Sequence, residues 1–182
     1  MKSKIIKIRH ERDLLRFKER YLEITGVSVD DEYLARADVY GLLTEPGIFN
    51  GGVIVNTTSP LRYEQYLSHG QLQEARFFDV RKGNMVEITC LWTNSEVFCT
   101  PRSRSRIQLL ALQKAFLSGK KYILASTFSE KLSRIQRLGF PYVIFEGYTE
   151  YFGKPMFHWL YYGTKASISI GVLKEIRRRF LF

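Results

Sequence analysis

Cysteine and histidine are scarce in this sequence, and their scarcity argues against two classes of protein. Only two cysteines, Cys90 and Cys99, occur among 182 residues, too few for a disulfide framework or a cysteine-rich zinc site. The three histidines, His10, His69 and His158, are scattered along the chain. We therefore expect no metal site. The two cysteines fit a reducing, cytoplasmic setting.

Long apolar runs are also missing. No segment approaches the roughly 20 apolar residues that a transmembrane helix needs, so none is expected. The first residues, MKSKIIKIRHERD, interrupt every apolar stretch with charge, which argues against a secretory signal peptide. The length of 182 residues suits one domain, which we expect to span residues 1–182.

Acidic residues are outnumbered, which bears on partners. Lys plus Arg is 28 against 18 for Asp plus Glu, and the formal net charge is +10. An excess of this size favours acidic or phosphate-bearing partners, including nucleic acid, an anionic membrane surface, a phosphate-bearing cofactor or an acidic protein.

Hydrophobic periodicity predicts alternating strands and helices. Strands are expected over residues 4–9, 39–44, 52–57, 85–93, 122–126, 142–151 and 156–162. Helices are expected over residues 10–25, 102–117, 129–138 and 171–182, with a helix or ordered loop over 59–73. Because a helix of this length between two strands allows a crossover, the strands at 85 and 122 should form a parallel pair.

This order of elements, together with the segment ILASTFSEKLSRIQRLGFPYVIFEGYTE, resembles the GCN5-related N-acetyltransferase (GNAT) superfamily. Leu138, Gly139 and Phe140 match a Leu-Gly-Phe that ends a short helix there. The resemblance implies an α/β fold with a mixed, mostly antiparallel central sheet, helices on both faces and a splayed parallel strand pair. Its substrates would be an acyl thioester and an amine.

A narrower resemblance lies in the strand at 85. The segment EITCLW looks like a strand of acyl-homoserine-lactone synthases and N-acyl amino acid synthases, which take a long acyl chain from acyl carrier protein. Glu87 and Thr89 match that strand, whereas Cys90 stands where those enzymes usually have arginine. Two GNAT features are missing: the glycine-rich turn before the central helix, and a tyrosine general acid before Leu-Gly-Phe.

Glu87 is the candidate catalytic residue. It lies in the middle of an apolar strand, and a buried carboxylate is costly unless it is paired or functional. As a general base it would take a proton from an attacking amine, directly or through one water. The alternative is a glutamate on the solvent-facing side of the strand.

Arginines at the start of the central helix form the candidate donor site. A helix N-terminus and guanidinium groups both attract phosphate, so the site would hold a phosphopantetheine or coenzyme A (CoA) phosphate. Its residues are Arg102, Ser103, Arg104, Ser105 and Arg106. The alternative is a solvated charge run.

Two further sets of residues are weaker candidates. Aromatic and neighbouring residues on strands could line a thioester and acyl pocket, or could be ordinary core: Trp92, Thr93, Phe98, Phe145 and Trp159. Arg16 and Arg20 on the first helix could contact the acceptor or the carrier protein, and the basic C-terminus could contact an anionic membrane. Cys90 and Cys99 are expected to be bystanders, and His158 a packed strand residue.

The sequence therefore predicts an N-acyltransferase that moves an acyl group, expected to be fatty, from acyl carrier protein or acyl-CoA to an amine, without a metal. The charge and the missing glycine turn favour acyl carrier protein. One alternative is a non-catalytic member of the fold that holds lipid or thioester. The other is a basic nucleic-acid-binding module, which is disfavoured because the basic residues lie in distant segments and no nucleic-acid motif is recognisable.

Overall fold

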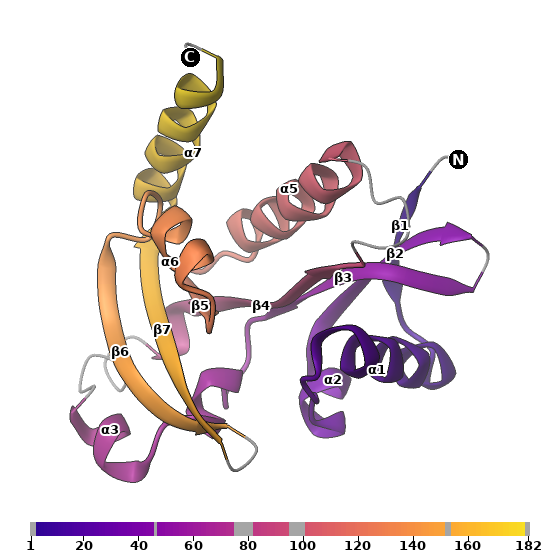
Figure 1. Cartoon of the computed structure of the whole chain (residues 1–182), viewed down its shortest axis with the longest axis horizontal. Helices are drawn as coiled ribbons and strands as arrows, with labels where there is room; N and C mark the ends of the chain where they lie inside the picture. The colour runs from indigo at the N-terminus through magenta and orange to yellow at the C-terminus, as the bar shows by residue number, and fades with distance from the viewer. Residues whose placement is uncertain (1–2, 46, 75–81, 95–100, 152–153, 181–182) are drawn as a thin grey trace. The chain divides into compact units, whose positions relative to one another are not determined.

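The structure is a computed structural model that describes residues 3–45, 47–74, 82–94, 101–151 and 154–180. Its strands are hydrogen-bonded into one seven-stranded sheet in the order β1-β2-β3-β4-β5-β7-β6, shown with the helices in Figure 1. The chain divides into two compact units, which are described separately below. Unit 1 contains Met1–Asn56 and Ile88–Leu117, and unit 2 contains Thr57–Glu87 and Ser118–Phe182.

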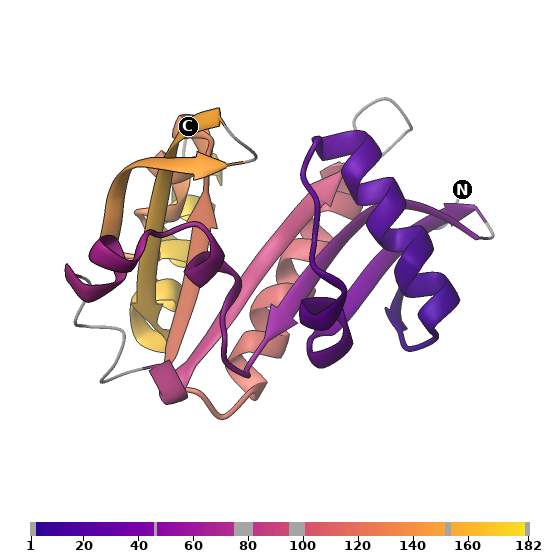
Figure 2. The same cartoon turned by 90° about the horizontal axis from the view of Figure 1, so that it is seen from below.

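Unit 1 is built on an antiparallel sheet. It contains β1 (Lys4–Ile8), α1 (Glu11–Thr25), α2 (Asp31–Arg36), β2 (Asp38–Glu45), β3 (Ile48–Asn56), the second part of β4 (Met85–Thr93) and α5 (Pro101–Leu117). β1 pairs with β2, and β2 pairs with β3, both antiparallel. Helices α1 and α5 both contact β3 and cover its opposite faces (Figures 1 and 2).

The core of unit 1 lies under α1. Phe17 is fully buried in this helix, and its ring packs edge-on against Phe49 and Trp92 at centroid distances of 5.9 and 6.0 Å. The helix ends where Gly26 adopts the left-handed conformation (φ 70°) and its N–H bonds to the carbonyl of Leu22, the expected helix stop.

Unit 2 contains the remaining strands of the sheet. Its elements are η1 (Arg62–Gln65), α3 (His69–Glu74), η2 (Lys82–Asn84), the start of β4, β5 (Tyr122–Thr127), α6 (Glu130–Gln136), β6 (Tyr142–Tyr151), β7 (Lys154–Thr164) and α7 (Lys165–Phe180). β7 lies between β5 and β6 and is antiparallel to both. Leu61, just before η1, and Tyr63 in η1 pack with Met85, Leu124 and Leu160 on one face of this sheet. Helices α6 and α7 lie on the other face (Figure 2).

The sequence-based elements are largely confirmed. β4 spans Met85–Thr93 as predicted, and it is the neighbour of β5 in a sheet that contains one parallel pair. Ser129 is the N-cap of α6, because its side chain accepts the N–H of Leu132. The splay of the parallel strands and the single-domain organisation stay predictions.

Glycine accounts for two wrong boundaries. The hairpin turn was expected over residues 45–51, but β3 already begins at Ile48. Gly51, expected at the end of the turn, belongs to β3, where a Cβ would lie 3.0 Å from the Trp92 carbonyl oxygen. The last helix begins at Lys165, not at 171. Gly171 lies inside this helix, where a Cβ would meet the carbonyl oxygen of Leu138 at 2.4 Å.

No helix in the described part of the chain is long and apolar enough to span a membrane. Nor do three or more His, Cys, Asp or Glu side chains come together as a metal site within the described residues. Cys90 is a buried, free cysteine, whereas Cys99 lies outside the described residues.

Candidate functional site

Glu87 is buried in β4, with 1% of its surface exposed. One carboxylate oxygen accepts the backbone N–H of Arg62 at 2.8 Å, and the other accepts the backbone N–H of Tyr63 at 3.2 Å. The solvent-facing alternative for Glu87 is therefore wrong. Its carboxylate is held in the interior of unit 2, with a fixed direction.

The N–H groups that bind Glu87 belong to the first turn of η1. The first amides of a helical turn lack partners within the turn, so they need acceptors from elsewhere. Glu64 provides an acceptor for the residue just before η1, because its carboxylate accepts the backbone N–H of Leu61 at 2.8 Å. Glu87 provides acceptors for the next two amides. A carboxylate is the favoured partner here, because the amide dipoles stabilise negative charge.

Arg62 places a second charge in the same interior. Its side chain is buried, with 5% exposed, and its guanidinium carbon lies 5.5 Å from the centre of the Tyr66 ring. Within the residues whose burial is described, Arg62 and Glu87 are the charged side chains that are buried. Sequence reasoning missed Arg62, because an arginine after Ser-Pro-Leu has no pattern that distinguishes it from a surface residue.

His158 on β7 is fully buried among aromatic rings of unit 2. Its ring stacks on Phe128 at 4.6 Å and meets Tyr66 edge-on at 5.8 Å. Burial, with a smaller effect of the Arg62 charge, lowers the pKa of His158 from 6.5 to about 4. Neither ring nitrogen has a hydrogen-bond partner within the described residues. His158 is the packed strand residue that the sequence predicted, and it is neutral at pH 7.

The predicted donor site at the start of α5 is exposed. Arg104, Ser105 and Arg106 are solvent-exposed, and the Arg106 guanidinium donates to the carbonyl oxygen of Ser3 at 3.1 Å. The side chains of Arg102 and Ser103 lie outside the described residues. α5 begins at Pro101, a residue favoured at the first helical position. Binding of phosphate by this run stays a prediction.

The predicted pocket residues belong to different surroundings. Trp92 is a core residue of unit 1, 5% exposed and packed on Phe17, and Thr93 beside it is half-buried. Phe145 of unit 2 packs toward His158, at 6.2 Å between ring centres. Trp159, the next residue on β7, points to the other face of the sheet because strand side chains alternate. Phe98 lies outside the described residues. The acyl-pocket role of this set stays a prediction.

The two arginines of α1 already have acidic neighbours. Arg20 pairs with Glu23 at 2.6 Å, and Arg16 lies 3.8 Å from Asp13. Exposed pairs of this kind contribute little to stability. A partner could therefore displace them, and contact with an acceptor or a carrier protein stays a prediction.

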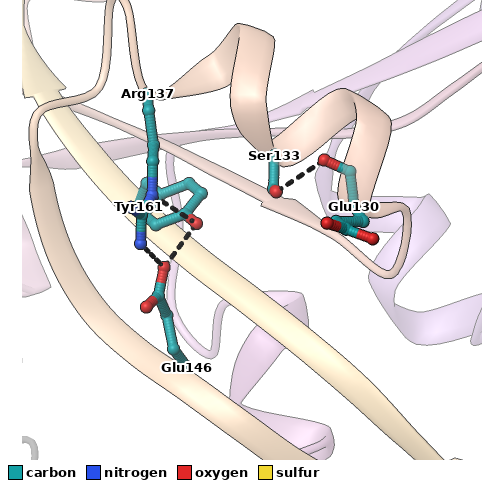
Figure 3. Close-up of polar contacts among 5 residues, drawn as sticks. All are labelled: Glu130, Ser133, Arg137, Glu146 and Tyr161. Atoms are coloured by element: carbon teal, nitrogen blue, oxygen red, sulfur yellow. Dashed lines mark hydrogen bonds and ion pairs between the residues drawn. The ribbon is translucent and has the colours of Figure 1, made fainter.

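A polar triad on the α6 face of unit 2 was not anticipated (Figure 3). The Tyr161 hydroxyl donates to Glu146 at 2.6 Å, Arg137 Nε donates to the Tyr161 oxygen at 3.1 Å, and Arg137 also pairs directly with Glu146. Burial and the Glu146 bond raise the pKa of Tyr161. Burial opposes ionisation of Glu146, but the Tyr161 and Arg137 bonds outweigh it and lower the pKa of Glu146.

The triad fixes the end of α6 to β6 and β7, because its members come from these three places. Nearby, the Ser133 hydroxyl donates to the carbonyl oxygen of Glu130 at 2.8 Å within α6 (Figure 3). The sequence could not reveal the triad, because its residues are separated by 9 and 15 positions along the chain.

Comparison with solved structures identifies the architecture. FeeM, an N-acyl amino acid synthase from uncultured soil microbes, is similar over 96% of this chain and 98% of its own, with 14% identity and a TM-score of 0.70. The fold is that of the GNAT acetyltransferases. A putative GNAT acetyltransferase from Desulfovibrio desulfuricans covers 90% of this chain and 99% of its own, at 11% identity and a TM-score of 0.58.

A further GNAT-fold structure was solved with a donor. Arabidopsis thaliana NAA60 in complex with acetyl-CoA covers 90% of this chain and 99% of its own, at 11% identity and a TM-score of 0.57. No family model and no curated protein matches the sequence. The predicted fold class, a mixed α/β sheet with one parallel pair, is confirmed.

Proposed function

We propose that this protein is an N-acyltransferase that transfers an acyl group from a phosphopantetheine thioester to an amine. The observation that carries the proposal is the full-length likeness to FeeM, an N-acyl amino acid synthase, at a TM-score of 0.70. The buried carboxylate of Glu87 on β4 adds a group suited to general-base chemistry.

In the proposed reaction the amine nitrogen attacks the thioester carbonyl carbon. The N–C bond forms, the C–S bond breaks, and the sulfur leaves as a thiolate that takes a proton from solvent. Glu87 accepts the proton that the amine loses, directly or through one water.

The reaction also needs stabilisation of the oxyanion that develops on the thioester oxygen, and backbone strain in β4 is suited to this role. Cys90 has a φ of 51°, a left-handed conformation that is uncommon for a residue other than glycine. Strain of this kind concentrates at functional sites. In the proposal it turns the strand so that backbone N–H groups near Trp92 and Thr93 point at the thioester oxygen, where charge develops.

For the donor we propose acyl carrier protein carrying a fatty acyl chain, with acyl-CoA as the competing choice. The net charge of +10 and the exposed Arg104 and Arg106 favour an acidic carrier. Acetyl-CoA is the donor named for NAA60, which supports the competing choice. A cytoplasmic location belongs to the same proposal.

One observation favours a second candidate function. Both Glu87 oxygens accept backbone N–H groups of η1, which is also what a purely structural carboxylate would do. A protein of this fold that binds lipid or thioester without turning it over would need nothing more from Glu87.

Acyl transfer can be assayed directly. The purified protein is incubated with acyl carrier proteins or CoA thioesters of several chain lengths and a set of amino acids and other amines. Thiol release is followed together with mass spectrometry of the acylated amine. Stoichiometric release of thiol and formation of amide support the proposal. Donor binding without turnover over the whole set supports the lipid-holding alternative.

A further inference from the structure

Helices α6 and α7 of unit 2 expose large apolar side chains. Leu173 is 64% exposed, Ile170 is 54% exposed and Leu132 is 49% exposed, and Ile135 and Leu138 are each 43% exposed. Isolated apolar residues on a surface need no explanation, but a contiguous group indicates an interaction site.

On α7 these side chains form a stripe with basic residues. Ile170, Leu173, Lys174 and Arg177 are all exposed and are spaced three and four residues apart. Residues at this spacing lie on one face of a helix. The apolar and cationic groups of α7 therefore point in the same direction, away from the face that buries Ile168.

The turn after α6 packs on the side of α7 that buries Ile168. A Cβ at Gly171 would be 2.4 Å from the Leu138 carbonyl oxygen, and one at Gly139 would be 3.4 Å from the Ile168 Cα. Figure 1 shows α6 beside the first turns of α7. We call the exposed side chains of Ile170, Leu173, Lys174 and Arg177, on the other side of this helix, the α7 stripe.

The helix that carries the α7 stripe is strongly basic. Residues 165–179 contain five Lys or Arg residues and one Glu residue. Three of the five form the cluster Arg177, Arg178 and Arg179 near the end of α7.

We propose that the α7 stripe docks the protein on an anionic lipid bilayer. A basic amphipathic helix lies in the membrane interface with its apolar side chains at the acyl boundary, and long cationic side chains beside them extend their charged ends to the headgroups. Each Lys or Arg near such a surface adds roughly a fivefold gain in affinity. This inference is independent of the proposed acyl transfer.

The bilayer explains the α7 stripe better than a second copy of the chain does. In a two-fold dimer the same patch faces itself, which would bring Lys174 and Arg177 of both copies together. Like charges at an interface are unfavourable. An anionic bilayer satisfies the charges and the apolar groups at the same time.

Vesicle flotation tests the proposal. The full chain is mixed with vesicles of phosphatidylcholine alone or of phosphatidylcholine with phosphatidylglycerol. We expect the protein to float with the anionic vesicles and not with the neutral ones, and added salt to weaken binding. Leu173→Glu with Arg177→Glu should reduce partitioning by at least about tenfold, as expected when a basic contact is reversed and an apolar one is lost. Circular dichroism should be unchanged, since both side chains are exposed.

The matched control makes the same change on α1. Arg12→Glu with Leu15→Glu replaces an exposed arginine and a leucine that is 53% exposed, and it should leave flotation as in the wild type. Equal losses in both variants, or equal binding to neutral vesicles, would overturn the proposal. Failure of the wild-type protein to float with anionic vesicles would also overturn it. The α7 stripe would then belong to a protein partner if the α7 variant abolished dimer formation or binding of acyl carrier protein.

Discussion

The carboxylate of Glu87 accepts the backbone N–H of Arg62 at 2.8 Å. These are the two residues with buried charged side chains in the described part of the chain, and they come from η1 and β4, 25 positions apart. Any role of Glu87 in chemistry is therefore joined to a role in fixing η1, and an experiment has to separate the two.

Glu87→Gln keeps the shape of the side chain and removes the base. We expect acyl transfer to fall by about 10²- to 10⁴-fold at neutral pH, the usual contribution of a general base. The loss should shrink at high pH, where more of the amine is already deprotonated. Steady-state rates across a pH series measure this, and donor binding should survive.

The same variant should also be less stable. The glutamine amide leaves an NH₂ group against a backbone N–H, so one charge-assisted hydrogen bond is lost at a cost of about 1.5–3 kcal/mol. Glu64→Gln is the matched control, because Glu64 also accepts an η1 amide and has no proposed role in catalysis. If both variants lose activity only in proportion to stability, Glu87 is a structural residue.

Removal of the three arginines at the start of α5 tests the donor site. Arg102→Ala, Arg104→Ala and Arg106→Ala together should weaken binding of the acyl carrier protein or CoA thioester. The expected cost is roughly 1.5–3 kcal/mol for each charge-assisted bond lost. Titration calorimetry with both donors measures it and shows which one depends on the arginines.

Arg134→Ala is the control for this triple variant. Arg134 is an exposed helical arginine whose ion pair with Glu130 lies on the surface, and it should leave donor binding unchanged. Equal affinity of the triple variant and the wild type would show that the run is only a solvated face.

His158 makes stability depend on pH. Its pKa is lowered from 6.5 to about 4 in the folded protein, so between these values the unfolded chain binds a proton that the folded chain does not. Stability is therefore lost as pH falls from 6.5 toward 4, by at most about 1.4 kcal/mol per pH unit. His158→Phe should flatten this part of the profile. Urea denaturation over the same pH range measures it, and parallel profiles for variant and wild type would contradict the assignment.

The triad of Arg137, Glu146 and Tyr161 predicts a further loss of stability in acid, which comes from a carboxylate. The lowered pKa of Glu146 means that its stabilisation is present above its unfolded pKa of about 4.5 and is lost as pH falls below that value. Tyr161→Phe should cost about 1–2 kcal/mol at pH 7, since a bond to a partly exposed charge is partly screened.

Glu146→Gln should show a similar deficit at pH 7 that shrinks in acid. Glu130→Gln removes a surface pair with Arg134 and should cost at most about 0.5 kcal/mol. Denaturation at neutral and acid pH compares Glu146→Gln with Glu130→Gln. Equal losses of unfolding free energy in both variants would mean that the triad contributes no more than an exposed helical pair.

The fold could be predicted from the sequence where pattern and order agree. β4 was placed to the residue, because its nine residues are rich in β-branched and aromatic side chains. The helix of Pro101–Leu117 between β4 and β5 predicted a crossover connection and therefore a parallel strand pair. The wrong boundaries at Gly51 and Gly171 share one cause. A glycine required by a close contact looks the same in sequence as one that forms a turn.

The candidate site was predictable only in part. Glu87 stands out in an apolar strand, so its burial was foreseen as a possibility. The hydrogen bonds from Arg62 and Tyr63 and the rings around His158 come from segments far away in the chain. No local pattern records such contacts, and the same holds for Tyr161 and Glu146.

The close approach of α7 to the turn at Leu138 and Gly139 has a consequence for local opening. A Cβ at Gly171 would lie 2.5 Å from the Gly139 Cα, and one at Gly163 would lie 2.6 Å from the Gly139 carbonyl oxygen. Backbone against backbone buries little apolar surface, and Ile168 is the buried apolar side chain among the described ones of α7. Through its described side chains, α7 is therefore held in a narrowly defined position by few contacts. Its amide hydrogens should exchange through detachment of the helix, well before the strands of unit 2 unfold.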